Sequence, residues 1–276
     1  SKQKNVSGHI FSCISRENKL CNDSSTIKLL SKTDGVKAHI YSPKELQEEI
    51  DEVFNLVGRT LEEPFDFGMI YAYFLYKKAS EKGVRVMLDG IDGDMALSLP
   101  FDYPLHLVKQ DEIIKGYTQL MKQTKLYQFG IIATLKAVVR MFLSHYLPSP
   151  LKNHYRKWNQ QKSIDNELKD TLVSSNFAQK ANLVERLILF EKNRRKNNQS
   201  SLPQIYLNQI SHPFLTVGLE RYNRVASSCS IEPRHPLLDK RIVDFFSALP
   251  WNIIVRNGWS KYLLRITAET MLPVEA

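Results

Sequence analysis

The densest group of potentially reactive side chains lies between residues 89 and 94, where the sequence reads D-G-I-D-G-D. Asp89, Asp92 and Asp94 crowd three carboxylates into six residues, so their repulsion must be offset by a hard cation such as magnesium or by hydrogen-bond donors. A calcium-binding EF-hand loop is excluded, because its third and fifth positions need acidic side chains and here they are Ile and Gly. An ordinary turn is the alternative, since Asp and Gly both tolerate left-handed backbone.

Lys261 is a second candidate, because Ser260 is predicted to cap a final helix that begins at Lys261. The first turn of a helix presents unpaired amides and the positive end of the helix dipole. A lysine there is unfavourable unless an anion such as phosphate lies nearby. Gly258 permits close backbone approach just before it. The alternative is a surface lysine beside a capping serine.

The segment 232–236 reads E-P-R-H-P and is predicted to be extended, because a residue before proline is pushed out of helical space. Glu232 and Arg234, two residues apart, then lie on the same side, which predicts a structural ion pair. His235 is interpreted as a structural histidine, since no Ser or Cys nucleophile signature accompanies it. The chain contains neither a GxxxxGK[ST] nor a GxGxxG phosphate-binding motif.

Strands and helices are predicted to alternate over the first hundred residues, with strands near 9–15, 36–41 and 84–88. Ser42, Pro43 and Glu45 have the spacing of a capping box at a helix start. The alternation predicts a parallel sheet covered on both faces, and ligands of such sheets lie at the carboxyl ends of strands. Asp89 follows the third predicted strand directly. Other helices are expected near 24–31 and 67–80, and the apolar face of the capped helix is expected to contain Leu46, Ile50, Val53, Phe54 and Val57.

The pattern of predicted helices and strands divides the chain into three segments. Residues 1–98 read as a partial α/β lobe, residues 99–217 as a helical lobe punctuated by prolines, and residues 218–276 as a helical carboxy-terminal segment. The last segment contains a predicted helix that is stopped by Pro250. Its apolar side is expected to present Ile242, Val243, Phe245, Phe246 and Leu249.

Composition excludes several classes of protein. The net charge of +9 is spread along the chain instead of forming one basic run, so no nucleic-acid partner is indicated. The longest apolar stretch is too short to span a bilayer, and no membrane partner is expected. Cys13, Cys21 and Cys229 are odd in number and have neither disulfide-framework nor zinc-site spacing. A reducing, cytoplasmic location is expected.

Two blocks of sequence resemble the synthetase domain of the asparagine synthetase family. The segment V-R-V-M-L-D-G-I-D-G-D at 84–94 is similar to the family's strand and loop V-L-L-S-G-E-G-A-D-E. The second block begins N-R at 223 and continues through E-P-R-H-P-L-L-D at 232–239 and G-W-S-K-Y-L-L-R at 258–265 to L-P at 272. It resembles the family's D-R, E-x-R-x-P-F-L-D, G-x-x-K-x-x-L-R and L-P motifs.

The resemblance implies an α/β fold with an adenine nucleotide alpha hydrolase-like lobe, and a ligase that uses magnesium-ATP to adenylate a carboxylate. Ammonia or another amine then forms the amide. By position, Asp94 is implied to hold magnesium and pyrophosphate, and Lys261 to neutralise charge on the phosphates. The carboxy-terminal segment thereby returns to the active site. The remaining implied residues are Asp89, Gly90 and Cys13 at the nucleotide, with Glu232 and Arg234 positioning the active-site wall.

The chain also departs from the family pattern. The pyrophosphate loop S-G-G-x-D-S does not occur in it, so a partial chain is expected, with that loop and a glutaminase domain or partner upstream. Ile91 stands where asparagine synthetases place a glutamate, which puts aspartate in doubt as the substrate. Ring closure of the lasso-peptide-cyclase or β-lactam-synthetase kind is therefore an alternative. The absent loop leaves open a non-catalytic nucleotide-binding scaffold.

Overall fold

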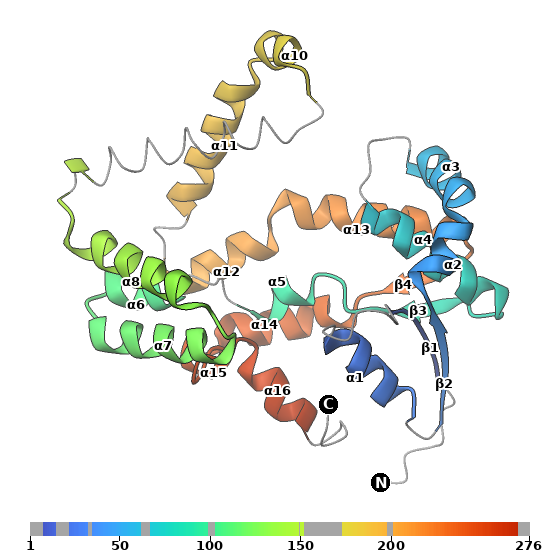
Figure 1. The fold of residues 1–276 in the computed structure, drawn as a ribbon, viewed down its shortest axis with the longest axis horizontal. Helices are drawn as coiled ribbons and strands as arrows, with labels where there is room; N and C mark the ends of the chain where they lie inside the picture. Colours follow the sequence, from blue (N-terminus) through green and yellow to red (C-terminus); the bar gives the residue numbers. More distant parts are fainter. Residues whose placement is uncertain are drawn as a thin grey trace. The chain divides into compact units, whose positions relative to one another are not determined.

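The computed structural model describes residues 8–14, 22–32, 35–61, 67–98, 103–148, 150–151, 173–197 and 201–269. They form two compact units, each assembled from separate stretches of chain (Figure 1). We call the first the strand unit: it contains the described residues up to Ala96, Ser211–Val243, and those from Leu263 onward. The second, the helical unit, contains Leu97–Ile210 and Asp244–Tyr262.

The strand unit is an α/β structure, as the alternation of patterns predicts. Its elements, in chain order, are β1 (Gly8–Cys13), α1 (Asn22–Leu30), β2 (Val36–Tyr41), α2 (Pro43–Glu48), α3 (Ile50–Leu61), α4 (Phe67–Glu81), β3 (Val86–Leu88), α5 (Gly93–Leu97), α13 (Pro213–Ser228), β4 (Glu232–Arg234) and a 3-10 turn (Pro236–Leu238).

The described strands form two parallel pairs and not the single sheet expected from the sequence. β1 pairs with β2, with Gly8 opposite Val36 and Cys13 opposite Tyr41. β3 is shorter than expected and pairs with β4, which comes from the far end of the chain. The strand pattern at 84–88 does not indicate which distant segment pairs with it. The proline in E-P-R also argues against a strand at 232–234, so β4 is not predicted from the sequence.

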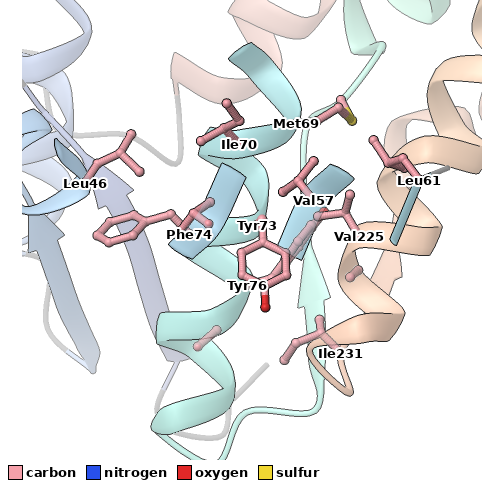
Figure 2. Packing of buried hydrophobic residues seen from close by; sticks show 13 residues of the cluster. Leu46, Val57, Leu61, Met69, Ile70, Tyr73, Phe74, Tyr76, Val225 and Ile231 are labelled. Atoms are coloured by element: carbon pink, nitrogen blue, oxygen red, sulfur yellow. The ribbon is translucent and has the colours of Figure 1, made fainter. Parts of the chain in front are cut away.

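The core of the strand unit is centred on α4, whose Ile70, Phe74 and Ala79 are buried (Figure 2). α4 packs against α3, α13 and β1, and Met87 of β3 also contacts the same cluster. Because these elements share one core, the two strand pairs are held by the same helix. Burial of each large apolar side chain in this cluster stabilises the fold by about 1.5–3 kcal/mol.

The capping box at Ser42 is confirmed. The Ser42 amide donates to the Glu45 carboxylate at 2.7 Å, and the Glu45 amide donates back to Ser42 Oγ at 3.4 Å. The expected single helix is wrong, however, because it breaks at Glu49 into α2 and α3. After the break Val53 and Val57 are buried, and Phe54, about 100° further round the helix, is 54% exposed instead of buried as expected.

Between residues 103 and 217 the described residues contain helices and no strand, in agreement with the sequence pattern. Gly116 lets the helix pair α6–α7 approach closely, since a Cβ there would lie 2.6 Å from the Pro104 carbonyl oxygen. Among the described residues no helix is long and apolar enough to cross a membrane. The helices of this part and the next are α6 (Tyr103–Lys109), α7 (Ile113–Leu126), α8 (Ile131–Tyr146), α10 (Ser175–Lys180), α11 (Leu183–Asn197), α12 (Leu202–Ile210), α14 (Lys240–Ala248), α15 (Trp251–Ile254) and α16 (Tyr262–Glu269).

The predicted helix before Pro250 is α14, and its apolar side is only partly covered. Phe246 is buried, whereas Phe245 is 54% exposed and does not take the buried position expected for it. The two neighbouring rings contact each other edge to face, with centroids 5.9 Å apart. Adjacent helical positions point about 100° apart, so one narrow contact surface covers only one of the two.

Candidate active site at the ends of β3 and β4

The carboxyl ends of β3 and β4 bring Asp89 and His235 together. Leu88 is opposite Arg234 in the parallel register, and the Asp89 amide extends the ladder by donating to the Arg234 carbonyl at 3.1 Å. The residues that follow the two strands therefore face each other. His235 Nδ1 lies 2.6 Å from Asp89 Oδ1, and both side chains are mostly buried.

Hydrogen-bond donors surround the carboxylate of Asp89. Besides His235, Tyr76 donates its hydroxyl to Oδ2 at 3.2 Å, and the Ile91 amide donates to Oδ1 at 3.2 Å. Burial, followed by the neighbouring Asp89 carboxylate, raises the pKa of Tyr76, so this hydroxyl keeps its proton and remains a donor. The repulsion between the crowded carboxylates can be offset by a cation or by hydrogen-bond donors, and for Asp89 the fold supplies donors.

Asp92 has left-handed backbone, with φ of 56°, a conformation that Asp tolerates better than most residues. Burial raises the pKa of its carboxyl group; His235 opposes this and Asp89 adds to it. A Cβ on Gly218 of α13 would lie 3.8 Å from Asp92 Oδ2, an ordinary van der Waals distance, so α13 passes close to this carboxylate. The Asp92 carboxylate is thus partly buried at a place that disfavours its charge.

Asp94 is exposed in the first turn of α5, directly after the buried Gly93. A Cβ on Gly93 would lie 2.5 Å from Leu237 Cδ1, so glycine lets the turn after β4 pack against the loop. Among the described residues no group of three or more His, Cys, Asp or Glu side chains could hold a metal ion. Within the described part of the chain, Asp94 is therefore not a member of any such group.

The ion pair predicted within the E-P-R segment is present. Arg234 Nε donates to Glu232 Oε1 at 2.8 Å, and the two side chains are 59% exposed. Their backbone, in contrast, forms β4: the Glu232 amide donates to the Arg85 carbonyl, and the Arg234 carbonyl accepts from Asp89. The main chain of this segment, and not its ion pair, is what binds the loop.

Cys13 and Gly90 lie in the same unit. Cys13 is the last residue of β1; its carbonyl accepts the Tyr71 hydroxyl at 2.7 Å, and burial raises the pKa of its thiol. Gly90 is exposed, and nothing lies within 4 Å of where its Cβ would be. The backbone next to Asp89 is therefore open to a ligand.

Lys261 lies in the helical unit, and its expected place in the first turn of a helix is wrong. α16 begins at Tyr262, and Lys261 precedes it with left-handed φ of 54°. Residues 256–259 form a tight turn, closed by hydrogen bonds between Arg256 and Trp259 in both directions. The predicted cap Ser260 hydrogen-bonds with its hydroxyl to the Tyr127 hydroxyl at 3.0 Å.

The tight turn is anchored on the carboxyl end of α7. Lys122 Nζ donates to Asn257 Oδ1 at 3.0 Å, and a Cβ on Gly258 would lie 2.7 Å from the Lys122 carbonyl carbon. Only a glycine with positive φ permits this approach, and the close backbone contact at Gly258 is with α7. Lys261 thus follows a segment that the helical unit holds in place.

Tyr76 and the pairing of His235 with Asp89 are not recognised from the sequence alone. Tyr76 reads as one more apolar position of α4, and His235 as a structural histidine. The available signal is positional: if the segments 84–88 and 232–234 pair in parallel, the polar residues that follow them must meet. Nothing in either segment specifies that pairing.

An α/β unit with polar side chains at the carboxyl ends of parallel strands defines a class of protein that binds ligands at that edge. The family model for asparagine synthase matches residues 3–276. Comparisons with curated proteins and with solved structures find no match. The chain belongs to the asparagine synthase family, a family of ATP-dependent amide-forming ligases.

Proposed function

We propose that this chain is the ATP-using part of a ligase that adenylates a carboxylate, releases pyrophosphate and passes the acyl group to an amine. The family match over residues 3–276 carries the proposal. The loop of Asp89 and Gly90 after β3 supports it, because Asp89 is held by donors while the backbone at Gly90 remains open.

Asp94 is the residue that would hold magnesium. Magnesium bound with a nucleotide takes one or two protein carboxylates together with phosphate oxygens, so it needs no three-residue cage. The exposed carboxylate of Asp94 fits that donor set. When bound, the ion would neutralise charge on the phosphates. Lys261 would add a second positive charge during pyrophosphate release, and Cys13 would contact the base with its backbone.

The carboxylate substrate is proposed to differ from that of asparagine synthetases. Ile91 is half-buried and supplies only its amide, as a donor to Asp89, where those enzymes place a glutamate. Closure of a ring, as in lasso-peptide cyclases and β-lactam synthetases, is the alternative amide-forming reaction. The second candidate function is a nucleotide-binding scaffold, because S-G-G-x-D-S does not occur in these 276 residues. It holds only if the full coding sequence lacks that loop as well.

The test compares this chain with the full-length gene product in assays of ATP–pyrophosphate exchange and pyrophosphate release. We expect activity in a polypeptide that also contains an S-G-G-x-D-S loop and none from these 276 residues alone. Asp94→Ala and Lys261→Ala should each lower the exchange rate by about 100-fold or more, because each removes charge compensation at the phosphates.

Three outcomes separate the possibilities. Pyrophosphate release from the purified chain above its Asp94→Ala control would contradict the expected need for that loop. An inactive full-length protein that still binds ATP would identify the scaffold. Mass measurement of the acyl-adenylate trapped from an active full-length protein would identify the carboxylate.

A further inference from the structure

The Asp89–His235 contact fixes the protonation pattern of the imidazole. An ionised carboxylate can only accept hydrogen bonds, and Asp89 has three donors in His235, Tyr76 and the Ile91 amide. Nδ1 of His235 therefore carries the proton in this contact. In the neutral ring, Nε2 then has the free lone pair, which is the tautomer of a proton acceptor held by a carboxylate.

The surroundings of His235 keep this arrangement in place. Its side chain is 17% exposed, so the ring is held by the protein but remains reachable. The titratable groups that face it are Asp89 and Asp92 from the loop after β3, with Tyr76 of α4 behind Asp89. An imidazolium formed here would be stabilised by the Asp89 carboxylate at 2.6 Å.

We infer that His235 accepts the proton from the attacking amine in the amide-forming step, with Asp89 as the residue that orients it. This role rests on the proposed function. The amine nitrogen forms a bond to the acyl carbon, the bond from that carbon to the AMP oxygen breaks, and AMP leaves with the electron pair. The nitrogen passes its surplus proton to Nε2 of His235.

Position supports His235 over His9 and His39, two other histidines of the strand unit. It directly follows β4, at the strand end where Asp89 and the open backbone of Gly90 lie. His9 and His39, whose ring nitrogens are 3.0 Å apart, belong to β1 and β2 and precede the last residues of both strands. Ile91 has no carboxylate that could take the proton instead.

The decisive variant is His235→Asn in the full-length gene product. The Asn side-chain amide can still donate to Asp89 from a place close to that of Nδ1, but it offers no lone pair in place of Nε2. His145→Asn is the matched control, since it removes a histidine that lies 4.0 Å from Asp111 in the helical unit. His235→Gln is a second variant in case the first does not fold.

Two half-reactions are measured separately. ATP–pyrophosphate exchange, with the twenty standard amino acids and common dicarboxylates as probes, reports adenylate formation. Amide formation is followed with ammonia and with hydroxylamine, which is largely unprotonated at neutral pH. For His235→Asn we expect exchange within about threefold of the wild type and transfer to ammonia lower by about 10²- to 10³-fold.

Hydroxylamine should restore most of the transfer that the variant loses. Equal losses of exchange and transfer would show a structural role and overturn the inference, as would an unchanged rate with ammonia. If the wild type shows no exchange with any probe, the proposed function fails first, and the role of His235 fails with it.

Discussion

Asp92 is a residue whose charge the fold disfavours. Burial raises the pKa of its carboxyl group above the ordinary value of 3.8, so the native state binds this proton more tightly than the unfolded chain does. The contribution of this group to stability is therefore greatest below that value and is lost as pH rises through the native pKa. We expect Asp92→Asn to raise the urea midpoint at pH 7, with a smaller gain at pH 4. Asn also tolerates the left-handed backbone at this position.

Asp239 serves as the control, because its pKa is shifted in the opposite direction to that of Asp92. Hydrogen bonds from the Arg241 side chain and amide lower the pKa of Asp239 to about 2. Its contribution is present above the ordinary value of 3.8 and is lost as pH falls through about 2. Asp239→Asn should lower the midpoint at both pH 7 and pH 4. A gain from Asp92→Asn that is equal at the two pH values would contradict this account.

At the scale of elements, the turn at 256–259 depends on Gly258. Alanine there would have positive φ and a Cβ 2.7 Å from backbone atoms of α7, which cannot move away as a side chain can. We expect Gly258→Ala to lower the free energy of unfolding by more than about 2 kcal/mol. The measurement is urea denaturation followed by circular dichroism.

Gly83→Ala is the matched control for that substitution. Gly83 also has positive φ, of 78°, but nothing lies within 4 Å of its Cβ position. Its replacement should cost only the backbone strain, about 1–2 kcal/mol. Equal losses in the two variants would show that contact with α7 contributes nothing at Gly258.

The start of α2 gives a third prediction. Ser42 and Glu45 satisfy each other's amides, so Ser42→Ala should lower the free energy of unfolding by about 1 kcal/mol. Ser174→Ala removes a cap in which Ser174 Oγ accepts from the Phe177 amide at 3.3 Å without a returning carboxylate such as that of Glu45, and it should cost less. Thermal unfolding of the two variants measures the difference, and a larger loss at Ser174 would contradict the reciprocal cap.

The sequence predicts well those elements that depend on interactions between residues close together in the chain. The capping box at Ser42 and strand 36–41 involve residues close in sequence, and both are confirmed. The sequence pattern puts Val53 and Phe54 on one apolar face, but adjacent residues of α3 point about 100° apart, and tertiary packing covers Val53 and not Phe54. The break at Glu49 is not predicted either, since no Gly or Pro marks it. The Asp89–His235 contact joins residues 146 positions apart, so it depends on a strand pairing that local patterns do not encode.

At the scale of the whole molecule, the described strands leave edges without a strand partner. β1 pairs only with β2, and β3 only with β4, among the residues that the structure describes. Val86 and Leu88 add exposed apolar surface to β3, and Leu88 is 69% exposed. Unpaired edges with apolar side chains are templates for association between chains.

We therefore expect these 276 residues, purified alone, to associate, with a scattering mass that rises with concentration. Leu88→Lys should reduce that association, because a charged side chain beside a strand edge opposes pairing with a second chain. Its effect on the free energy of unfolding should stay within about 0.5 kcal/mol, as for other exposed positions.

Leu189→Lys is the matched control, because Leu189 is also exposed, at 58%, but lies on helix α11 and not beside a strand edge. If both substitutions reduce association equally, general surface charge is the cause and the strand edges are not. A wild-type chain that stays monomeric and unfolds in one sharp transition would contradict the prediction altogether. In that case the described edges would have to be protected by contacts within the monomer.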